Sequence, residues 1–272
     1  MASRITKDTR LCISLSGRPS NIGTRFHNCL YDELGLDYVY KAFAPTDIKA
    51  AVAGMRGLGI RGAGVSMPFK EKVIPLVDVM HESARAIDSV NTIVNEDGVL
   101  HAYNTDFQAV LDLLVDQRVD PTLPVAVAGS GGMAKAVVAA VHAHGCADVT
   151  VVARNETAGR ALAGRYGFAW RGDVDDCTPA VLINATPVGM AGGPEAESLP
   201  FPTAVIEAAA VVVDVVAMPP ETPLLRAARA HGHPVISGAE VIALQAALQF
   251  ALYTGVTPTP AQVRRASEFS RS

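Results

Sequence analysis

The chain has 272 residues, of which 49% are apolar, and a formal net charge of −4 with a pI near 6.0. Its length exceeds the ~100–150 residues of a typical single domain, which favours two domains or one large α/β domain. Because no run of Lys or Arg is longer than a pair, these properties argue against a nucleic-acid or acidic-membrane partner and favour a small-molecule ligand.

The first hundred residues alternate short β-branched runs with longer helical patterns, which is typical of βαβ units. Strands are predicted over residues 11–17, 39–44 and 59–67, and Pro68 ends the last of them shortly before Lys70. Two further strands within 90–106 are joined by the turn Glu96-Asp97-Gly98. Helices are predicted over 24–34, with Thr24 as N-cap and Gly35 as stop, over 46–58, with Thr46 as N-cap, and over 81–87.

The pattern changes near residue 107. A predicted helix over 107–117 leads through a linker with Pro121 and Pro124 into a strand, a glycine loop and a helix. Further strands are predicted over 149–154, 180–186 and 210–217, and the four strands suit a doubly wound sheet spanning 108–238. An apolar helix over 239–254 and an amphipathic helix from Pro260 end the chain.

The cysteines and the hydropathy bear on the cellular compartment. Cys12, Cys29, Cys146 and Cys177 lie far apart without a CxxC spacing, so neither a disulfide framework nor a zinc site is predicted. The N-terminus lacks the apolar segment of a secretory signal. Apolar runs such as 205–219 are shorter than the ~20 residues of a membrane span. We therefore expect a cytoplasmic protein without a bound metal or a membrane partner.

The segment GSGGMA follows a predicted buried strand and opens a predicted helix, the context that a dinucleotide fingerprint requires. Glycines there permit a tight turn and let backbone N–H groups approach a pyrophosphate at the helix N-terminus. The alternative is a glycine-rich turn that binds nothing. The candidate cofactor-binding residues are Gly129, Ser130, Gly131, Gly132, Met133 and Ala134.

The end of the next strand bears on the choice between NAD and NADP. An acidic residue at that position suits the ribose hydroxyls of NAD, whereas an arginine suits the 2′-phosphate of NADP. Here the strand runs into Arg154 and Asn155, and a guanidinium can bind a phosphate through two parallel hydrogen bonds. NADP is therefore favoured, while the nearby Glu156 leaves NAD open.

Polar residues follow two predicted strands of the first domain. Asn91-Thr92 and Asn104-Thr105-Asp106 stand where carboxyl ends of strands are expected, the edge at which α/β proteins bind ligands. Each pair alone could be an ordinary turn. Together with Lys70 they form a pattern that favours a polar site.

The order and spacing of eight motifs make the sequence resemble the shikimate dehydrogenase family, and more closely its shikimate dehydrogenase-like branch. They cover essentially the whole chain: VSMPFKE (65–71), SVNTIV (89–94), YNTDF (103–107), GSGGMAKA (129–136), ARN (153–155), NATPVGM (184–190), DVVAMPPETPLL (214–225) and SGAEVIALQAALQF (237–250). The resemblance implies an α/β substrate-binding and catalytic domain over 1–107, to which 239–272 return. It implies a doubly wound Rossmann domain over 108–238 that binds NADP.

The resemblance also implies residue roles. Lys70 and Asp106 would act together on the reacting hydroxyl, the ammonium as proton donor and the carboxylate as its partner. Asn91 and Gln245 resemble positions that reach the substrate, although Gln245 could also be a helix-surface amide. Thr186, Val188, Gly189, Met190, Val215 and Gly238 resemble the cofactor pocket on its nicotinamide side, with Met190 equally suited to filling a core.

Several positions depart from the family pattern. Gly23-Thr24 replaces the Ser-Pro of a Ser-x-Ser-Pro segment that grips the substrate carboxylate, and the loop before it is two residues shorter in this alignment. Gly64 replaces Asn, Ser66 replaces Thr, and Ala217 replaces Tyr. Asn21, Thr24 and Ser66 are the remaining candidates for substrate binding, with Arg25 as a possible substitute for the lost serines.

These observations leave three hypotheses. The first is an NADP-dependent dehydrogenase that interconverts shikimate and 3-dehydroshikimate, or acts on a close relative such as quinate, as a monomer or homodimer. The second is a non-catalytic NADP-binding or regulatory protein on the same fold. The third, an unrelated Rossmann enzyme such as a folate dehydrogenase, explains the glycine loop but not VSMPFKE and NTD together.

Overall fold

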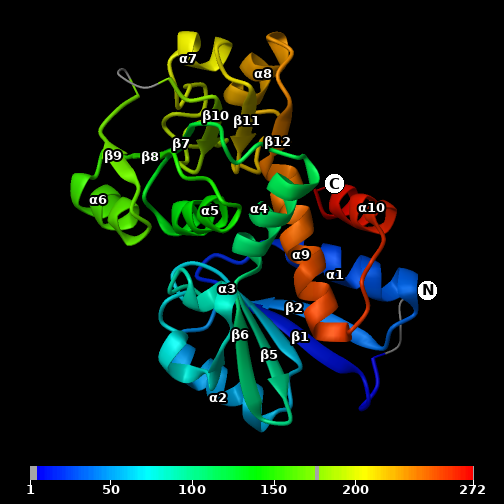
Figure 1. Cartoon of the computed structure of the whole chain (residues 1–272). Coiled ribbons are helices and arrows are strands. Elements are labelled where there is room, and N and C mark those ends of the chain that lie inside the picture. The colour runs from blue at the N-terminus through cyan, green and yellow to red at the C-terminus, as the bar shows by residue number, and fades with distance from the viewer. Residues whose placement is uncertain (1–4, 175–177, 272) are drawn as a thin grey trace. The chain divides into compact units, whose positions relative to one another are not determined.

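The computed structural model describes residues 5–174 and 178–271. They form two compact units, one made of the described residues up to Thr105 with those from Ala243 onward, the other of Asp106–Ile242. The expected boundaries, after residue 107 and before residue 239, lie within a few residues of these points. Each unit contains one β-sheet with helices beside it, which confirms the α/β class (Figure 1).

The first unit is built on a mixed sheet with the strand order β2-β1-β3-β5-β6-β4. β5 runs antiparallel to both neighbours, and the remaining pairs are parallel. Asp97 and Gly98 form the predicted turn between β5 and β6, at φ of 51° and 90°. The elements are β1 (Arg10–Leu15), α1 (Asn21–Leu34), β2 (Tyr38–Phe43), α2 (Ile48–Gly57), β3 (Gly62–Val65), the 3₁₀ turn Ile74–Leu76, β4 (Val79–Met80), α3 (Glu82–Arg85), β5 (Thr92–Glu96) and β6 (Val99–Tyr103).

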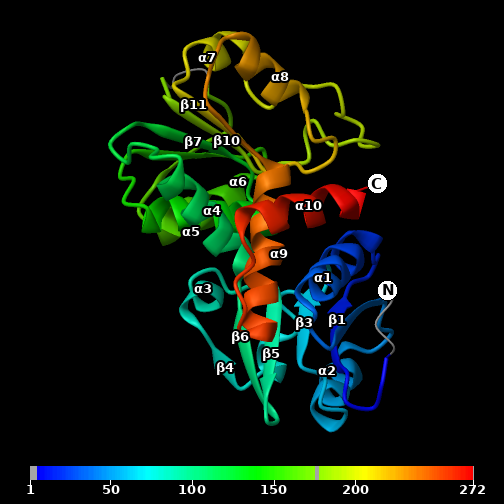
Figure 2. The ribbon, with the colours of Figure 1, turned by 90° about the vertical axis from the view of Figure 1, so that its right-hand side faces the viewer.

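Successive residues of the central strands face two different cores of this unit. Ile13 and Ile93 pack in a core beside α2, whereas Cys12 and Val94 pack in a second core with α1, α9 (Gly238–Thr254) and α10 (Pro260–Arg271). In Figures 1 and 2, α1, α9 and α10 lie together, and α2 lies apart from them. The C-terminal helices therefore complete a hydrophobic core of the first unit.

Helix α1 begins earlier than predicted. Its first residue is Asn21, preceded by Ser20 in the extended conformation, so Thr24 lies inside the helix and is not its N-cap. Ser, Thr, Asn and Asp share the preference for N-caps, and the sequence offers several of them in succession. Gly35 ends the helix as predicted, at a left-handed φ of 64°.

Helix α2 also has a different cap. It begins at Ile48, and the carboxylate of Asp47 accepts hydrogen bonds from the backbone N–H groups of Lys49 and Ala50 at 2.8 and 3.1 Å. The prediction of Thr46 as N-cap was therefore wrong by one residue. The cause is again the overlap of cap preferences, because only the backbone geometry decides which neighbour receives the N–H groups.

The second unit is a parallel sheet with the order β12-β11-β10-β7-β8-β9, the doubly wound order of a dinucleotide-binding fold. Two of its six strands, β9 and β12, were not predicted, because three residues are too few to show an alternating pattern. The elements are α4 (Thr105–Asp116), β7 (Val125–Ala128), α5 (Gly132–Ala143), β8 (Val149–Val152), α6 (Glu156–Arg165), β9 (Ala169–Arg171), β10 (Val181–Asn184), α7 (Thr203–Glu207), β11 (Val211–Asp214), α8 (Pro223–Ala230) and β12 (Val235–Ser237).

Three of the four cysteines, Cys12, Cys29 and Cys146, carry free thiols, and Cys177 lies outside the described residues. Within residues 5–174 and 178–271, no group of three or more His, Cys, Asp or Glu side chains is arranged to hold a metal ion. Over the same ranges, none of the helices combines the length and the apolar character needed to cross a membrane.

His27 on α1 gives the first unit an acid sensitivity. Its ring is fully buried and stacks on Tyr40 with 4.3 Å between centroids, and burial lowers the pKa of His27 to about 3. In the unfolded chain the His27 ring is protonated near pH 6.5, whereas in the folded chain it stays neutral down to about pH 3. The contribution of His27 to the free energy of unfolding is therefore fully present above pH 6.5. It falls as the pH drops, by about 2 kcal/mol between pH 6.5 and 5.

Urea unfolding at pH 7.5 and pH 5 measures this loss. The His27→Phe variant keeps an aromatic ring on Tyr40 but removes the titrating group. Between the two pH values, its free energy of unfolding should therefore fall by about 2 kcal/mol less than that of the unaltered protein. Equal changes in both proteins would show that another group causes the acid sensitivity.

Candidate functional site

A glycine turn follows β7 in the second unit. Gly129 has a φ of +119°, which side chains rarely tolerate, and a Cβ there would lie 2.8 Å from the carbonyl oxygen of Ala185. Ala185 directly follows β10, the strand on the other side of β7 from β8. The turn therefore lies where the strand order reverses, the point at which doubly wound sheets bind ligands.

Helix α5 points its N-terminus into the space beside this turn. Gly131 is its N-cap, and a Cβ added to Gly131 or Gly132 would meet nothing within 4 Å. The first turn of α5 contains no acidic residue, so the partial positive charge of the helix end is not neutralised there. Open glycines, free approach to the backbone and a helix N-terminus together fit the phosphates of a dinucleotide.

The turn forms one wall of a cavity of about 480 Å³ within the second unit, which we call the glycine-turn cavity. Its lining comes from the ends of β7, β8, β9 and β10 and from the loop before α7. The lining residues are Ala128, Gly129, Ser130, Gly131, Val152, Ala153, Arg154, Asn155, Gly172, Asp173, Val174, Ala185, Thr186, Pro187, Val188, Glu195, Leu199, Pro200 and Pro202.

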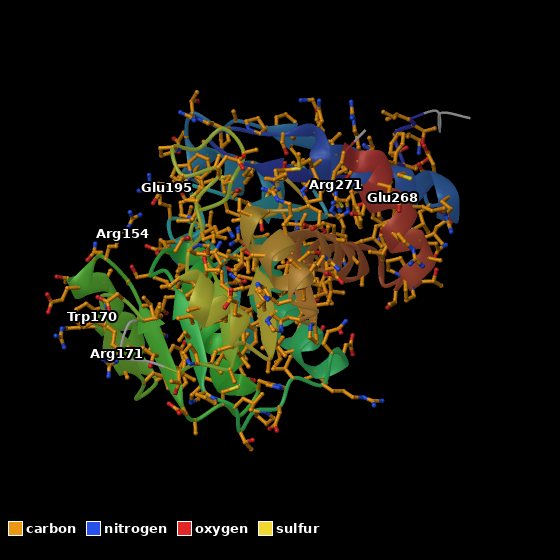
Figure 3. All side chains as sticks on the ribbon, turned by 90° about the horizontal axis from the view of Figure 1, so that it is seen from above. Arg154, Trp170, Arg171, Glu195, Glu268 and Arg271 are labelled. Atoms are coloured by element: carbon orange, nitrogen blue, oxygen red, sulfur yellow. The ribbon has the colours of Figure 1, made fainter. Side chains whose placement is uncertain are left out.

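The end of β8 brings Arg154 and Asn155 to this cavity. Both terminal nitrogens of Arg154 donate to the carboxylate of Glu195 at 3.4 Å, and Figure 3 shows these side chains at one edge of the unit. Asn155 is the N-cap of α6, where its Oδ1 accepts from the N–H of Ala158 at 3.0 Å. Glu156, which left NAD open, pairs with Arg160 at 2.8 Å and does not line the cavity.

A buried polar network supports the loop after β10. Oδ1 of Asn184 accepts from the backbone N–H and the hydroxyl of Thr186 at 3.0 and 2.6 Å, and its Nδ2 donates to Val188 O at 3.1 Å. Nδ2 also donates to Asp214, whose burial raises its pKa, and Asp214 in turn accepts from Thr222 at 2.6 Å. Two of the predicted cofactor residues, Thr186 and Val188, are thereby held in the cavity wall.

Seven of the predicted cofactor residues do not line the cavity: Gly132, Met133, Ala134, Gly189, Met190, Val215 and Gly238. Gly132 is exposed, Met133 is half-buried, and Ala134 is fully buried in α5. Gly189, at a φ of +86°, donates its N–H to Glu195 O, and Met190 beside it is exposed. Val215 donates its N–H to Asn184 O, and Gly238 packs so tightly on Val216 O that a Cβ would overlap it.

The first unit holds a buried polar network at the carboxyl end of β6 and the amino end of β5. The prediction that Asn91-Thr92 follow a strand was therefore wrong, because Thr92 is the first residue of β5 and β5 runs antiparallel to β6. Oδ1 of Asn91 accepts from the N–H of Thr105 and the hydroxyl of Thr92, both at 2.8 Å. Nδ2 of Asn91 donates to Thr105 Oγ1 at 3.0 Å, and this hydroxyl lies 3.3 Å from Oε1 of Gln245. The structure thus brings two predicted substrate residues, Asn91 and Gln245, together through Thr105. We call these four residues the Asn91 network.

Lys70 and Asp106 both neighbour the Asn91 network, Lys70 through a backbone hydrogen bond and Asp106 along the chain. The carbonyl of Lys70, in the turn after β3, accepts from the N–H of Val90 at 2.9 Å, one residue before Asn91. Asp106 follows Thr105 in the first turn of α4. Backbone and side-chain hydrogen bonds therefore lead from Lys70 to the residue preceding Asp106. Their meeting at one hydroxyl stays a prediction.

The remaining substrate candidates lie at the start of α1 and after β3. Asn21 is exposed at the first position of α1, and Thr24 follows one helical turn later with a buried hydroxyl. Arg25 is exposed. Ser66 is exposed, its N–H donating to Leu15 O at 2.9 Å and its carbonyl accepting from Phe69.

The departure at Gly64 has a structural cause. A Cβ at Gly64 would lie 2.8 Å from the hydroxyl of Tyr40, whose ring is buried against His27. The asparagine usual at this position would therefore collide with Tyr40. Gly23, another departure, also faces Tyr40: a Cβ added to Gly23 would lie 3.8 Å from the Tyr40 ring. At that distance an added Cβ makes an ordinary contact, so only Gly64 is required to make room for the phenol.

Gly64→Ala is expected to lower the free energy of unfolding by about 1–3 kcal/mol, because the buried Tyr40 cannot move away from the new methyl group. In a Tyr40→Phe background the hydroxyl is gone, and the same substitution should cost clearly less. A urea double-mutant cycle measures the difference. Equal costs in both backgrounds would refute the role of Tyr40.

Two residues of these sites were not predicted. Gln249 is buried one turn after Gln245 on α9, and its Nε2 donates to Thr92 Oγ1 at 3.0 Å and to Asn91 O at 3.2 Å. The spacing of four residues between the two glutamines in an apolar helix was the available signal. Glu195 lies in a loop without regular structure, and the sequence contains no signal that pairs it with Arg154.

The parallel strand order, the glycine turn at its reversal point and the open helix N-terminus define a Rossmann-type protein. Residues 21–93 match the family model of the shikimate dehydrogenase substrate binding domain. Over 268 residues the chain is 52% identical to the shikimate dehydrogenase-like protein of Haemophilus influenzae, covering 98% of this chain and 99% of that protein. The chain belongs to the shikimate dehydrogenase family.

Solved structures agree with this assignment. The structure of a shikimate 5-dehydrogenase-like protein matches with a TM-score of 0.97 and 52% identity, covering 99% of this chain and all of that one (100%). Shikimate 5-dehydrogenase from Thermus thermophilus, in complex with NADP(H) and shikimate, matches with a TM-score of 0.86 and 28% identity over 96% of this chain and 99% of that one. The family resemblance read from the motifs is thereby confirmed.

Proposed function

We propose that the protein is an NADP-dependent oxidoreductase that interconverts shikimate and 3-dehydroshikimate, or a closely related cyclic polyol acid and its ketone. The observation that carries the proposal is the Asn91 network, which fixes an amide and two hydroxyls at strand ends bordered by Lys70 and Asp106. A protein that only bound a nucleotide in its second unit would have no use for this network in the first unit.

The glycine-turn cavity fits the cofactor. Gly129, Gly131 and the N-terminus of α5 would hold the pyrophosphate, since only glycines allow the backbone N–H groups to approach it. Arg154 would hold the 2′-phosphate of NADP. When bound, the nicotinamide group supplies or accepts the hydride.

The proton transfer is assigned to Lys70, a residue of the first unit. The Lys70 ammonium donates a proton to the carbonyl oxygen during reduction and takes it back from the hydroxyl during oxidation. Asp106 orients that ammonium, and Asn91 and Gln245 hydrogen-bond the ring hydroxyls of the substrate. Asn21, Thr24 and Ser66 are proposed to contact the carboxylate end of the substrate in place of the serines that the sequence lacks.

The test is a spectrophotometric assay at 340 nm with shikimate, quinate and other cyclic polyol acids, each with NADP and with NAD. Reduction of NADP with shikimate or one of these acids supports the proposal. Calorimetry of NADP binding accompanies the assay. If the protein binds NADP but reduces it with no substrate of the panel, the non-catalytic hypothesis replaces the proposal.

A further inference from the structure

The glycine-turn cavity presents more acid than base to its ligand. Of the described residues that line it, Arg154 is basic, whereas Asp173 and Glu195 are acidic. The two oxygens of Glu195 lie opposite the two terminal nitrogens of Arg154, each pair 3.4 Å apart. The carboxylate therefore occupies the guanidinium face that a phosphate would use.

Glu195 is held at the cavity by its backbone. Its carbonyl accepts hydrogen bonds from the N–H of Gly189 at 2.9 Å and of Ser198 at 3.1 Å, which closes the loop on itself at this residue. The neighbouring Glu197 differs: it does not line the cavity, and its carboxylate pairs with Arg226 at 3.4 Å. Only one of two glutamates in the same loop thus faces Arg154.

We infer that Glu195 sets the cofactor selectivity of this protein by competing with the 2′-phosphate of NADP for Arg154. NADP binds only after its phosphate has displaced the carboxylate, and it then stays close to a negative charge. NAD carries no 2′-phosphate and leaves the Arg154–Glu195 pair intact. The preference for NADP over NAD is therefore smaller than it would be if Arg154 were present without the Glu195 carboxylate. This inference rests on the proposed dinucleotide site.

The exposure of the pair limits the size of the effect. The Arg154 side chain is 80% exposed and that of Glu195 38%, so water and salt weaken their attraction and a phosphate can displace the carboxylate. Removing the charge of Glu195 should strengthen NADP binding about twofold to fivefold at low ionic strength and less at high salt.

Isothermal titration calorimetry with NADP⁺ and NAD⁺ tests the inference without an activity measurement. In Glu195→Gln at low ionic strength, the Kd for NADP⁺ should fall about twofold to fivefold while the Kd for NAD⁺ stays as in the unaltered protein. Glu197→Gln is the matched control, because it removes the same charge from the same loop away from Arg154, and both Kd values should stay as in the unaltered protein.

The outcomes separate this inference from the proposal on which it rests. If the unaltered protein binds both dinucleotides and Glu195→Gln leaves the ratio of their Kd values unchanged, Glu195 does not set selectivity and the inference is overturned. An equal gain in Glu197→Gln would also overturn it, because the cause would be the net charge alone. If the unaltered protein binds neither dinucleotide, the proposed cofactor site fails and this inference fails with it.

Discussion

Lys70→Ala is expected to lower kcat by about 10²- to 10⁴-fold with the substrate identified by the 340 nm assay, the range typical of a lost general acid–base group. The affinity for NADPH should not change, because the glycine-turn cavity lies within the second unit and Lys70 belongs to the first. Steady-state kinetics measures the first effect and calorimetry the second.

Lys72→Ala provides the control for this substitution. Lys72 is exposed two residues further along the same turn, so its loss removes an equal charge without touching the proposed chemistry. It should retain nearly full kcat. Turnover in Lys70→Ala within about tenfold of the unaltered protein would rule out Lys70 as the acid–base group.

Gly129→Ala is expected to abolish most dinucleotide binding. The substitution forces a side chain into a φ of +119° and places its Cβ 2.8 Å from Ala185 O, so the turn must shift to relieve about 1–3 kcal/mol of strain. Because the N–H groups of this turn would hold the pyrophosphate, the Kd for NADP should rise about tenfold to hundredfold. Calorimetry with NADP measures the loss, and urea unfolding measures the strain.

Gly164→Ala is the matched control in the same unit. Gly164 lies in α6, and a Cβ there would meet nothing within 4 Å. Alanine at a helical position should raise stability by up to about 1 kcal/mol and leave NADP binding unchanged. If Gly129→Ala binds NADP as tightly as Gly164→Ala does, the glycine turn is not the pyrophosphate site.

Elements with a long periodic pattern were predictable, and short elements were not. α2 and α10 are long enough to show the helical period of apolar and polar residues, whereas β9 and β12, at three residues each, are too short to show any period. The N-caps of α1 and α2 were misassigned because more than one residue with a cap preference stands near the start of each helix. Local preference thus predicted that a helix starts, but not at which residue.

The residues of the candidate sites likewise fall into those that the sequence indicated and those that only the structure revealed. The glycine turn and Arg154 follow strands, so a linear pattern was enough to find them. Gln249 contacts the Asn91 network only through hydrogen bonds to Asn91 and Thr92, which precede it by 158 and 157 positions in the sequence. Glu195 meets Arg154 across 41 positions of sequence, and no local preference encodes such a pair.

The sequence by itself determined the alternation of strands and helices and the family to which the chain belongs, because these depend on the order of neighbouring residues. Only the tertiary structure decided why Gly64 is a glycine, which carboxylate faces Arg154 and which hydroxyl joins Asn91 to Gln245. The physical reason is that hydrogen bonds and excluded volume act through space. Residues far apart in the chain contribute to them only after the sheets have formed.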